Sequence, residues 1–212
     1  STATGGRREQ ILSKSGALPW AQSISEKNRK AILNQLGKLD DDELDFWNRN
    51  AYMIQGDFAY QGGTAYYMPS EQKVYLDLSK LGPKESRLKL ETNLVTFFHE
   101  TGHMFDWQAF GYPSLHEQIG DLDKTLRADY TAYAKRLLEQ KGLGEFHGLS
   151  RLTSDQGMAL SMDLYDDMHM KSSVSDIVGG LTKNTVQGGW GHSKEYWKYQ
   201  KPSVEAMAHM FE

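Results

Sequence analysis

The run His99-Glu100-Thr101-Gly102-His103 contains the residues whose types and spacing most clearly predict chemistry in this chain. Two histidines four positions apart in a helix project from the same face, one turn apart. Their imidazole nitrogens can then meet one metal ion at the zinc–nitrogen distance of about 2 Å. Glu100 follows the first histidine, so its carboxylate lies beside the metal and can take a proton from a zinc-bound water. The run therefore predicts a hydrolytic zinc site.

A catalytic zinc needs a third protein ligand and one open position. In one common pattern a third histidine lies ten residues after the first, beyond a glycine, but this chain has Ala109 there and Asp106 in the place of the glycine. No cysteine is present, so the ligand must be a histidine or a carboxylate farther along. Glu205 is the strongest candidate because it opens an apolar helix after Pro202. The others are His116, His147, Asp155, His169, Asp176, His192 and His209.

Two further residues of this segment have competing interpretations. Asp106 lies three positions after His103 and shares its helix face. We expect it to orient a ligand imidazole, and the alternative is a solvent-facing carboxylate near the helix end. Gly102 costs a helix about 1 kcal/mol relative to alanine, which suggests the close approach of another element, or simple tolerance.

The elements that must position these residues follow from hydrophobic periodicity and turn signals. Residues 84–110 predict the long helix that carries the run, with Leu88, Leu94, Val95, Phe98 and Phe105 on its apolar face. Just before it, 64–68 and 73–78 are rich in aromatic and β-branched residues and flank the turn signal 69–72, which predicts a β-hairpin. An edge of that hairpin could pair with an extended substrate peptide, or the hairpin is purely structural.

Farther along, apolar spacing predicts a second strong helix over 119–140, followed by a loop with Gly142, Gly144 and Gly148. Shorter helices are expected over 154–170 and 173–180, a loop or tight hairpin at 188–191, and a final helix over 203–212. Four methionines of the 154–170 segment are expected to pack against the protein core. They are Met158, Met162, Met168 and Met170.

The N-terminal part reads as a helical segment. Residues 1–20 are expected to be loosely ordered, because glycines and a proline interrupt any pattern. Residues 23–37 predict a helix capped by Ser23 or Ser25 and ended by Gly37, and 40–51 predict a second one. We therefore divide the chain into an N-terminal helical segment, 1–60, and a main domain, 61–212, with one compact domain as the alternative.

Composition limits the classes of partner. The 212 residues are 39% hydrophobic and 25% charged, with a formal net charge of −4. An acidic chain is a poor ligand for nucleic acid, and no apolar stretch approaches the roughly 20 residues that span a bilayer, so neither partner is expected. Without cysteine the chain needs no oxidising compartment. It begins without a signal-like segment and ends inside a predicted helix, so we expect a domain of a longer protein that is cytoplasmic, virion-associated or secreted.

The segments HETGHMFD (99–106) and PSVEAMAHMF (202–211) resemble the glutamate-type zincins, or gluzincins. More narrowly, they are similar to the peptidase domain of anthrax lethal factor and its relatives, and 173–197 is similar to the C-terminal part of phage minor head proteins. The resemblance covers about residues 64–212. It implies an α+β zincin-like fold, mostly helical with a small antiparallel sheet or hairpin. It also implies one zinc ion held by His99, His103 and Glu205, with Glu100 as general base.

The resemblance leaves the oxyanion-stabilising group open. In that family a tyrosine shortly before the ligand glutamate has this role. Here Tyr199 precedes Glu205 by six positions and Tyr196 by nine, and neither matches the usual spacing. His192 could do the same as a cation. The family also has a second glutamate four residues after the ligand, where this chain has His209. His209 is expected to support the metal ligands without binding the metal, and the alternative is that it faces elsewhere.

Three functions fit these observations. The first is a zinc endopeptidase acting on a peptide or protein substrate. The second is a non-enzymatic zinc-binding module of a phage or mobile-element protein, whose partners would be other phage structural proteins or the rest of a longer chain. The third is a toxin effector protease with the same chemistry and another target. The intact Glu100 favours an enzyme, because zinc binding alone does not need that carboxylate.

Overall fold

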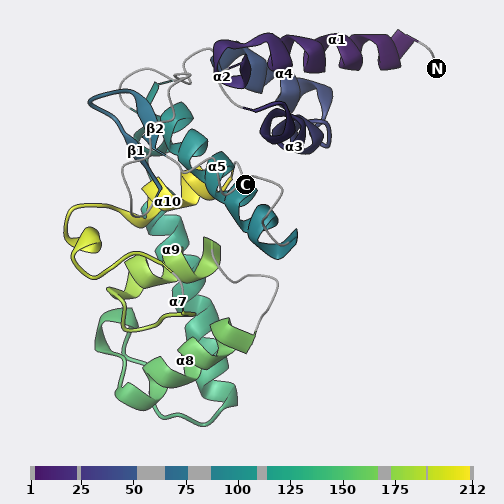
Figure 1. Ribbon diagram of the computed structural model, residues 1–212. Coiled ribbons are helices and arrows are strands. Elements are labelled where there is room, and N and C mark those ends of the chain that lie inside the picture. Colours follow the sequence, from purple (N-terminus) through teal and green to yellow (C-terminus); the bar gives the residue numbers. More distant parts are fainter. Residues whose placement is uncertain are drawn as a thin grey trace. The chain divides into compact units, whose positions relative to one another are not determined.

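A computed structural model describes residues 3–22, 25–51, 65–75, 87–108, 114–166, 173–189 and 191–210. The chain forms two compact units, which we call the first unit (residues 1–112 with 210–212) and the second unit (113–209). The described residues are mostly helical, with one two-stranded antiparallel sheet (Figure 1), as expected for an α+β chain. The domain boundary predicted near residue 60 lies outside the described residues. No described helix combines the length and the apolar character that crossing a membrane requires.

The first unit begins with helices α1 (Ala3–Ala17) and α2 (Pro19–Gln22). The prediction that residues 1–20 are loosely ordered is therefore wrong. Packing outweighs the weak local signals: Ile11 and Trp20 are buried, and the side chain of Asn48 donates to the carbonyl of Ile11 at 3.0 Å. Ser15, also buried, donates to the same Asn48 side chain. Tertiary contacts routinely override helix propensity in this way.

The next two helices are confirmed, the first with its predicted cap Ser25. Helix α3 spans Glu26–Leu36, and the side chain of its N-cap Ser25 accepts from the backbone N–H of Asn28 at 3.2 Å. Helix α4 spans Asp41–Asn50. Its N-cap Asp40 forms a capping box with Glu43, which satisfies two backbone donors at once. Both starts are therefore determined by residues within one turn, and the alternative cap Ser23 lies outside the described residues.

The predicted hairpin is confirmed. Strands β1 (Tyr66–Met68) and β2 (Lys73–Tyr75) pair antiparallel, with Tyr67 opposite Val74. These two side chains are buried, and both strands pack against helix α5 (Arg87–Gln108). The side chain of Gln108 donates to the Tyr67 hydroxyl, and burial raises the pKa of Tyr67 to about 12 despite that bond. Residues 76–78 of the predicted second strand and the ends of the predicted 84–110 helix are outside the described residues.

An aromatic cluster holds α5 within the first unit. The Trp47 ring lies 5.3 Å from Phe105 and 5.4 Å from Phe98, both at steep interplanar angles. The Trp20 ring lies 5.8 Å from Phe97. The edge-on contacts of Trp47 add to the stabilisation that burial of the rings provides. The N-terminal helices and the helix that carries the histidine motif therefore share one core. Val95, predicted on the apolar face of this helix, is instead exposed.

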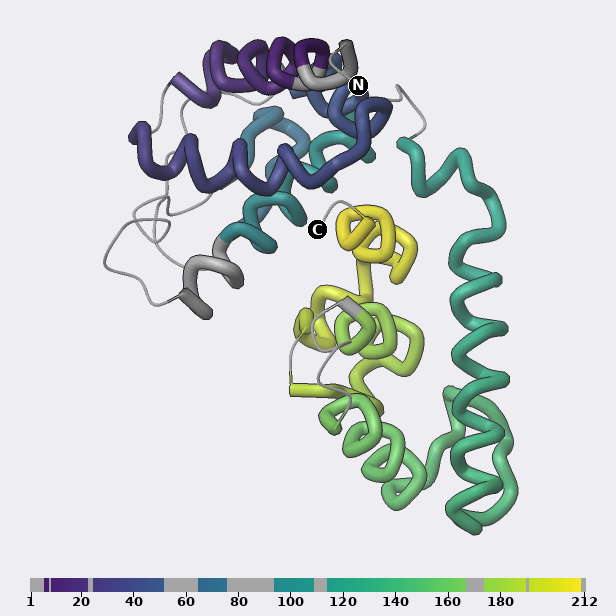
Figure 2. The backbone as a smooth tube through the Cα atoms, turned by 90° about the vertical axis from the view of Figure 1, so that its right-hand side faces the viewer, coloured from purple at the N-terminus to yellow at the C-terminus, as the bar shows by residue number. Residues whose placement is uncertain are grey.

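The second unit is helical, with a core of residues from α7, α8, α9 and the segments that follow α7 and α9. The predicted 119–140 helix begins at Leu122, after a separate short helix, because the chain turns at Gly120 with φ +45°. Figure 2 traces the path of the unit from α7 to the C-terminal segment. Its elements are α6 (Leu115–Gln118), α7 (Leu122–Gln140), η3 (Leu149–Arg151), α8 (Ser154–Asp166), α9 (Ser173–Thr182), η4 (Tyr196–Lys198) and α10 (Pro202–His209).

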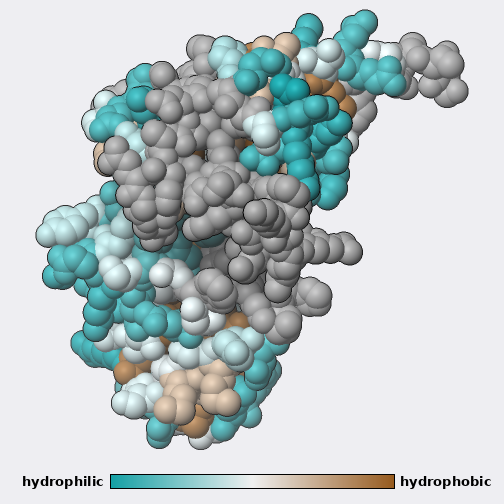
Figure 3. Space-filling view, viewed as in Figure 1, coloured by the Kyte–Doolittle hydropathy of each residue, from teal (hydrophilic) through white to brown (hydrophobic). Residues whose placement is uncertain are grey.

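The prediction that the methionines of α8 are interior is wrong for the two that are described. Met158 and Met162 are 63% and 60% exposed, and apolar residues gather over α8 in Figure 3. The inward face of α8 is filled by Leu160 and Leu164, which are four positions apart and belong to the core. Met168 and Met170 lie outside the described residues.

Candidate metal centre

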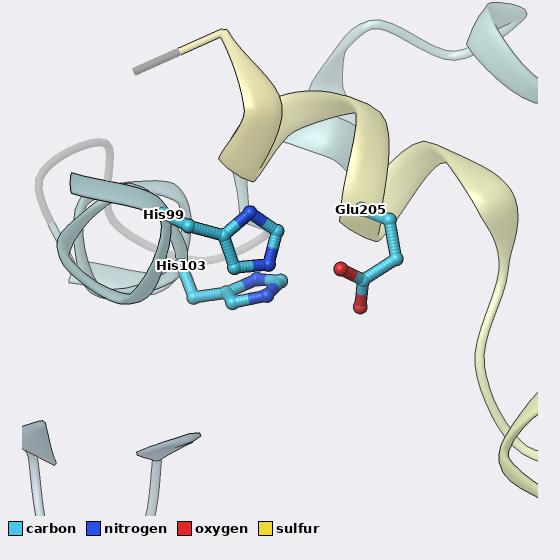
Figure 4. Close-up of side chains that lie close together, drawn as sticks. All are labelled: His99, His103 and Glu205. Carbon is cyan, nitrogen blue, oxygen red and sulfur yellow. The ribbon is translucent and has the colours of Figure 1, made fainter. Parts of the chain in front are cut away.

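The histidines of the motif project from the same side of α5 (Figure 4). The ring centroids of His99 and His103 lie 4.7 Å apart, with the rings nearly perpendicular at 86°. Glu100 is buried, and so is Asp106, which excludes the solvent-facing alternative for that carboxylate. The first unit therefore brings two imidazoles and two buried carboxylates onto one helix.

The two residues between Glu100 and His103 are buried as well. The Thr101 hydroxyl donates to the carbonyls of Phe97 and Phe98, each at 3.0 Å. These bonds satisfy the hydroxyl inside the helix, so a polar residue there adds no unsatisfied group to the aromatic core. Thr101 is thus explained by packing, and the metal-binding potential of α5 comes from the two histidines.

The second unit contains the remaining predicted site residues, around Glu205 in α10. Glu205 is fully buried. The hydroxyl of Tyr196, in η4, donates to its Oε1, and His192 Nδ1 lies 4.0 Å from the same oxygen. Tyr199 is 79% exposed. Of the two tyrosines that the sequence left open, the structure therefore joins Tyr196 to the candidate ligand.

Asp176, in α9, is a hydrogen-bonding centre behind these residues. It accepts from the backbone N–H of His192 at 2.8 Å and pairs with Nδ1 of the same ring at 2.9 Å. His209 Nε2 lies 3.7 Å from its Oδ2. Burial raises the pKa of Asp176, but the hydrogen bonds from His192 and the nearby imidazole of His209 outweigh the effect of burial, so the pKa lies below its ordinary value. Asp176 is therefore a carboxylate at neutral pH.

Ring stacking links the Asp176–His192 pair to Tyr196. The centroids of His192 and Tyr196 lie 3.8 Å apart, at an interplanar angle of 19°. Trp197 meets both rings edge-on, at 5.7 and 5.0 Å. A Cβ on Gly180 in α9 would come within 2.8 Å of the Trp197 ring. The glycine in α9 thus allows the aromatic residues of the loop to pack closely.

The start of α10 is held by a carboxylate of α7. Asp123 accepts from the backbone N–H of Ser203 at 2.9 Å and from its hydroxyl at 2.7 Å. The Arg127 side chain, one turn along α7, donates to the carbonyl of Leu181 near the end of α9 at 3.1 Å. These bonds fix the helices that carry Glu205 and Asp176 to the same neighbour.

Several of these residues could hold a metal ion. Within the second unit, Asp176, His192 and Glu205 each offer one ligand atom, and these atoms lie within 4.8 Å of one another. Asp176 and Glu205 are buried. A histidine nitrogen with carboxylate oxygens is a common donor set for zinc and other first-row metals. Buried groups close enough to bind a metal are therefore present.

The other histidines named from the sequence lie in different surroundings. His116 is buried, and its ring is hydrogen-bonded to the Ser114 hydroxyl at 3.0 Å. His147 is exposed, 4.0 Å from Glu145. Asp155 is exposed in the first turn of α8, and His169 lies outside the described residues. Sequence reasoning named Asp176 only as a possible ligand. Its hydrogen bonds to His192, sixteen positions away, could not be predicted from the sequence. The glycines around 188–191 are the one feature there that indicates an unusual backbone path.

Comparison with known proteins found no match, whether with family models, with curated proteins or with solved structures.

Proposed function

We propose that this chain is a zinc-dependent endopeptidase with a zincin-like fold. His99, His103 and Glu205 hold one zinc ion, and Glu100 is the general base. The observation that carries the proposal is the pair of His99 and His103 imidazoles on one side of α5, with the buried Glu100 directly after the first of them in sequence. A purely structural zinc site would gain nothing from that carboxylate, which is costly to bury.

The donor set fits the metal. Two imidazole nitrogens and one carboxylate are the ligands of one major class of catalytic zinc site, and Glu205 is buried on a helix whose first turn is fixed by Asp123. When bound, zinc supplies a nucleophile at neutral pH by lowering the pKa of its water to about 7.

The chain's own residues would supply the rest of the chemistry. Glu100 accepts the proton of the attacking water and passes it to the leaving amine. The Tyr196 hydroxyl lies at Glu205, so it is the better placed of the two tyrosines to donate to the developing oxyanion. The substrate is a peptide segment, and an edge of the β1–β2 hairpin offers backbone groups with which an extended peptide could pair. A phage structural protein and a host protein are both consistent with this site.

Elemental analysis combined with a peptide-library assay tests the proposal. We expect about one zinc per chain and cleavage in the wild type, and zinc without cleavage in Glu100→Gln. Glu139→Gln, which changes an exposed glutamate on α7, is the matched control and should cleave normally. Zinc in the wild type with no cleavage would favour the structural phage module. A metal-replete preparation without zinc would contradict both readings.

A further inference from the structure

We propose that Asp176 is a positioning residue. It sets the orientation and tautomer of the His192 ring, and this ring in turn holds the Tyr196 hydroxyl against Glu205. As a role in catalysis this inference rests on the proposed function, but as a statement about His192 it stands on the second unit alone.

Asp176 and His192 are joined by two hydrogen bonds. One carboxylate accepts both the backbone N–H of His192, at 2.8 Å, and its ring Nδ1, at 2.9 Å. A carboxylate can only accept, so the proton of a neutral ring must be on Nδ1. The ring then has its tautomer and both of its torsions restrained by one residue, much as the orienting carboxylate acts in other His–Asp pairs.

The His192 ring in turn supports the ring of Tyr196. The two rings are stacked at 3.8 Å, so a rotation of His192 would remove the surface on which the phenol lies. The Tyr196 hydroxyl then donates to Glu205 Oε1. Asp176 therefore acts on Glu205 through two intervening side chains, and its own oxygens need not touch the substrate.

The absence of a side chain at Gly191 allows the backbone there to lie close to the Asp176 carboxylate. Gly191 has φ +126°, and a Cβ there would lie 2.9 Å from Asp176 Oδ1. Gly189, two residues earlier, also has a positive φ of +87°, but its Cβ would meet only the Tyr165 ring, at 3.9 Å. Alanine is strained at both positions, yet only at Gly191 would it push against the Asp176 carboxylate.

These two glycines provide a test that leaves every ionisable group in place. Gly191→Ala should separate His192 from Asp176, whereas Gly189→Ala should impose a similar backbone strain without doing so. Asp176→Asn is the third variant. It keeps the shape of the side chain, but one of the two oxygens near Nδ1 becomes an amide N–H, so a single neutral oxygen must accept from both N–H groups of His192.

The primary readout is the His192 tautomer in ¹H–¹⁵N spectra of the ring, assigned by comparison with His192→Gln. We expect the Nδ1–H form in the wild type and in Gly189→Ala, and a shift toward Nε2–H in Asp176→Asn and Gly191→Ala. This readout needs no activity, so it remains decisive if the chain proves not to be a peptidase. An unchanged tautomer in both Asp176→Asn and Gly191→Ala would overturn the proposal.

The second readout is catalytic. In Asp176→Asn and Gly191→Ala, kcat should fall about 10- to 100-fold, as is typical when a residue behind a functional side chain is lost. KM and zinc content should change little, and circular dichroism confirms folding. Loss of zinc from Asp176→Asn would show that Asp176 is a ligand, which contradicts a positioning role. If Asp176→Asn fails to fold, the comparison of the two glycine variants decides.

Discussion

The hydroxyl of Tyr196 donates a hydrogen bond to Oε1 of Glu205, nine positions farther along the chain. This contact places a phenol at the carboxylate that we propose as the third zinc ligand. The Tyr196 ring stacks on the His192 ring, which limits its movement. A donor that is already oriented before the reaction stabilises a developing negative charge at little reorganisation cost.

Tyr196→Phe should lower kcat by about 10²- to 10³-fold, the usual effect of removing one oxyanion donor. Zinc content should stay the same, because the ring still stacks on His192. Tyr199→Phe is the control, since Tyr199 is 79% exposed, and it should cleave at the wild-type rate. Steady-state kinetics on one peptide substrate decides, and the reverse pattern would reassign the oxyanion role to Tyr199.

Zinc should raise the melting temperature of the wild-type chain. A ligand present at 100 times its Kd stabilises the folded state by about 2.7 kcal/mol if the unfolded state does not bind it. His103→Ala should abolish the shift, whereas His147→Ala, which changes an exposed histidine, should leave it intact. Thermal melts with added zinc and with a chelator measure this. An equal zinc response in His103→Ala would show that the metal binds elsewhere.

Asp123→Ala should lower the free energy of unfolding by about 0.5 to 2 kcal/mol, the range found for lost helix caps. The reason is that Asp123 accepts both the backbone N–H and the hydroxyl of Ser203 at the start of α10. Asp121→Ala is a suitable control, because Asp121 is exposed and its side chain forms no capping bond to α7. Urea denaturation of the three proteins gives the comparison, and equal losses in both variants would count against the cap.

The free energy of unfolding should fall as the pH rises from about 10 to about 12. In the unfolded chain Tyr67 ionises near pH 10, whereas in the folded chain its pKa is about 12, mainly because of burial. Protons are then lost from the unfolded state first, which favours unfolding. Tyr67→Phe should flatten this slope, and Tyr66→Phe, on the exposed neighbour, should not. Denaturant titrations at several alkaline pH values measure the slope.

Local signals in the sequence predicted much of the fold. The predicted cap Ser25 acts within one turn of its helix, and a second short helix forms within the predicted range 40–51. The hairpin follows from a turn signal between two aromatic segments. The spacing of His99 and His103 predicts two imidazoles on one helix face, and that is how they lie. All of these depend on residues fewer than ten positions apart, where geometry follows from the helix or strand period.

The incorrect predictions concern features that local signals do not control. Residues 3–17 form a helix despite Gly5, Gly6 and Gly16, because their burial against α4 outweighs the propensity cost. Met158 and Met162 are exposed because Leu160 and Leu164 already fill the inward face of α8. Periodicity marks a face as apolar, but only the neighbouring elements decide which apolar residues are covered.

The sequence by itself determined the chemical inventory: two histidines and a glutamate at motif spacing, no thiol, and a carboxylate-bearing helix near the C-terminus. It could not choose between Tyr196 and Tyr199, nor pair Asp176 with His192. Those relationships depend on how the loop between α9 and α10 folds back. The loop can pack this closely because Gly180 and Gly191 have no side chains that would clash with Trp197 and Asp176. Hydrogen-bond partners that are distant in sequence are set by the path of the backbone, so only the tertiary structure decided them.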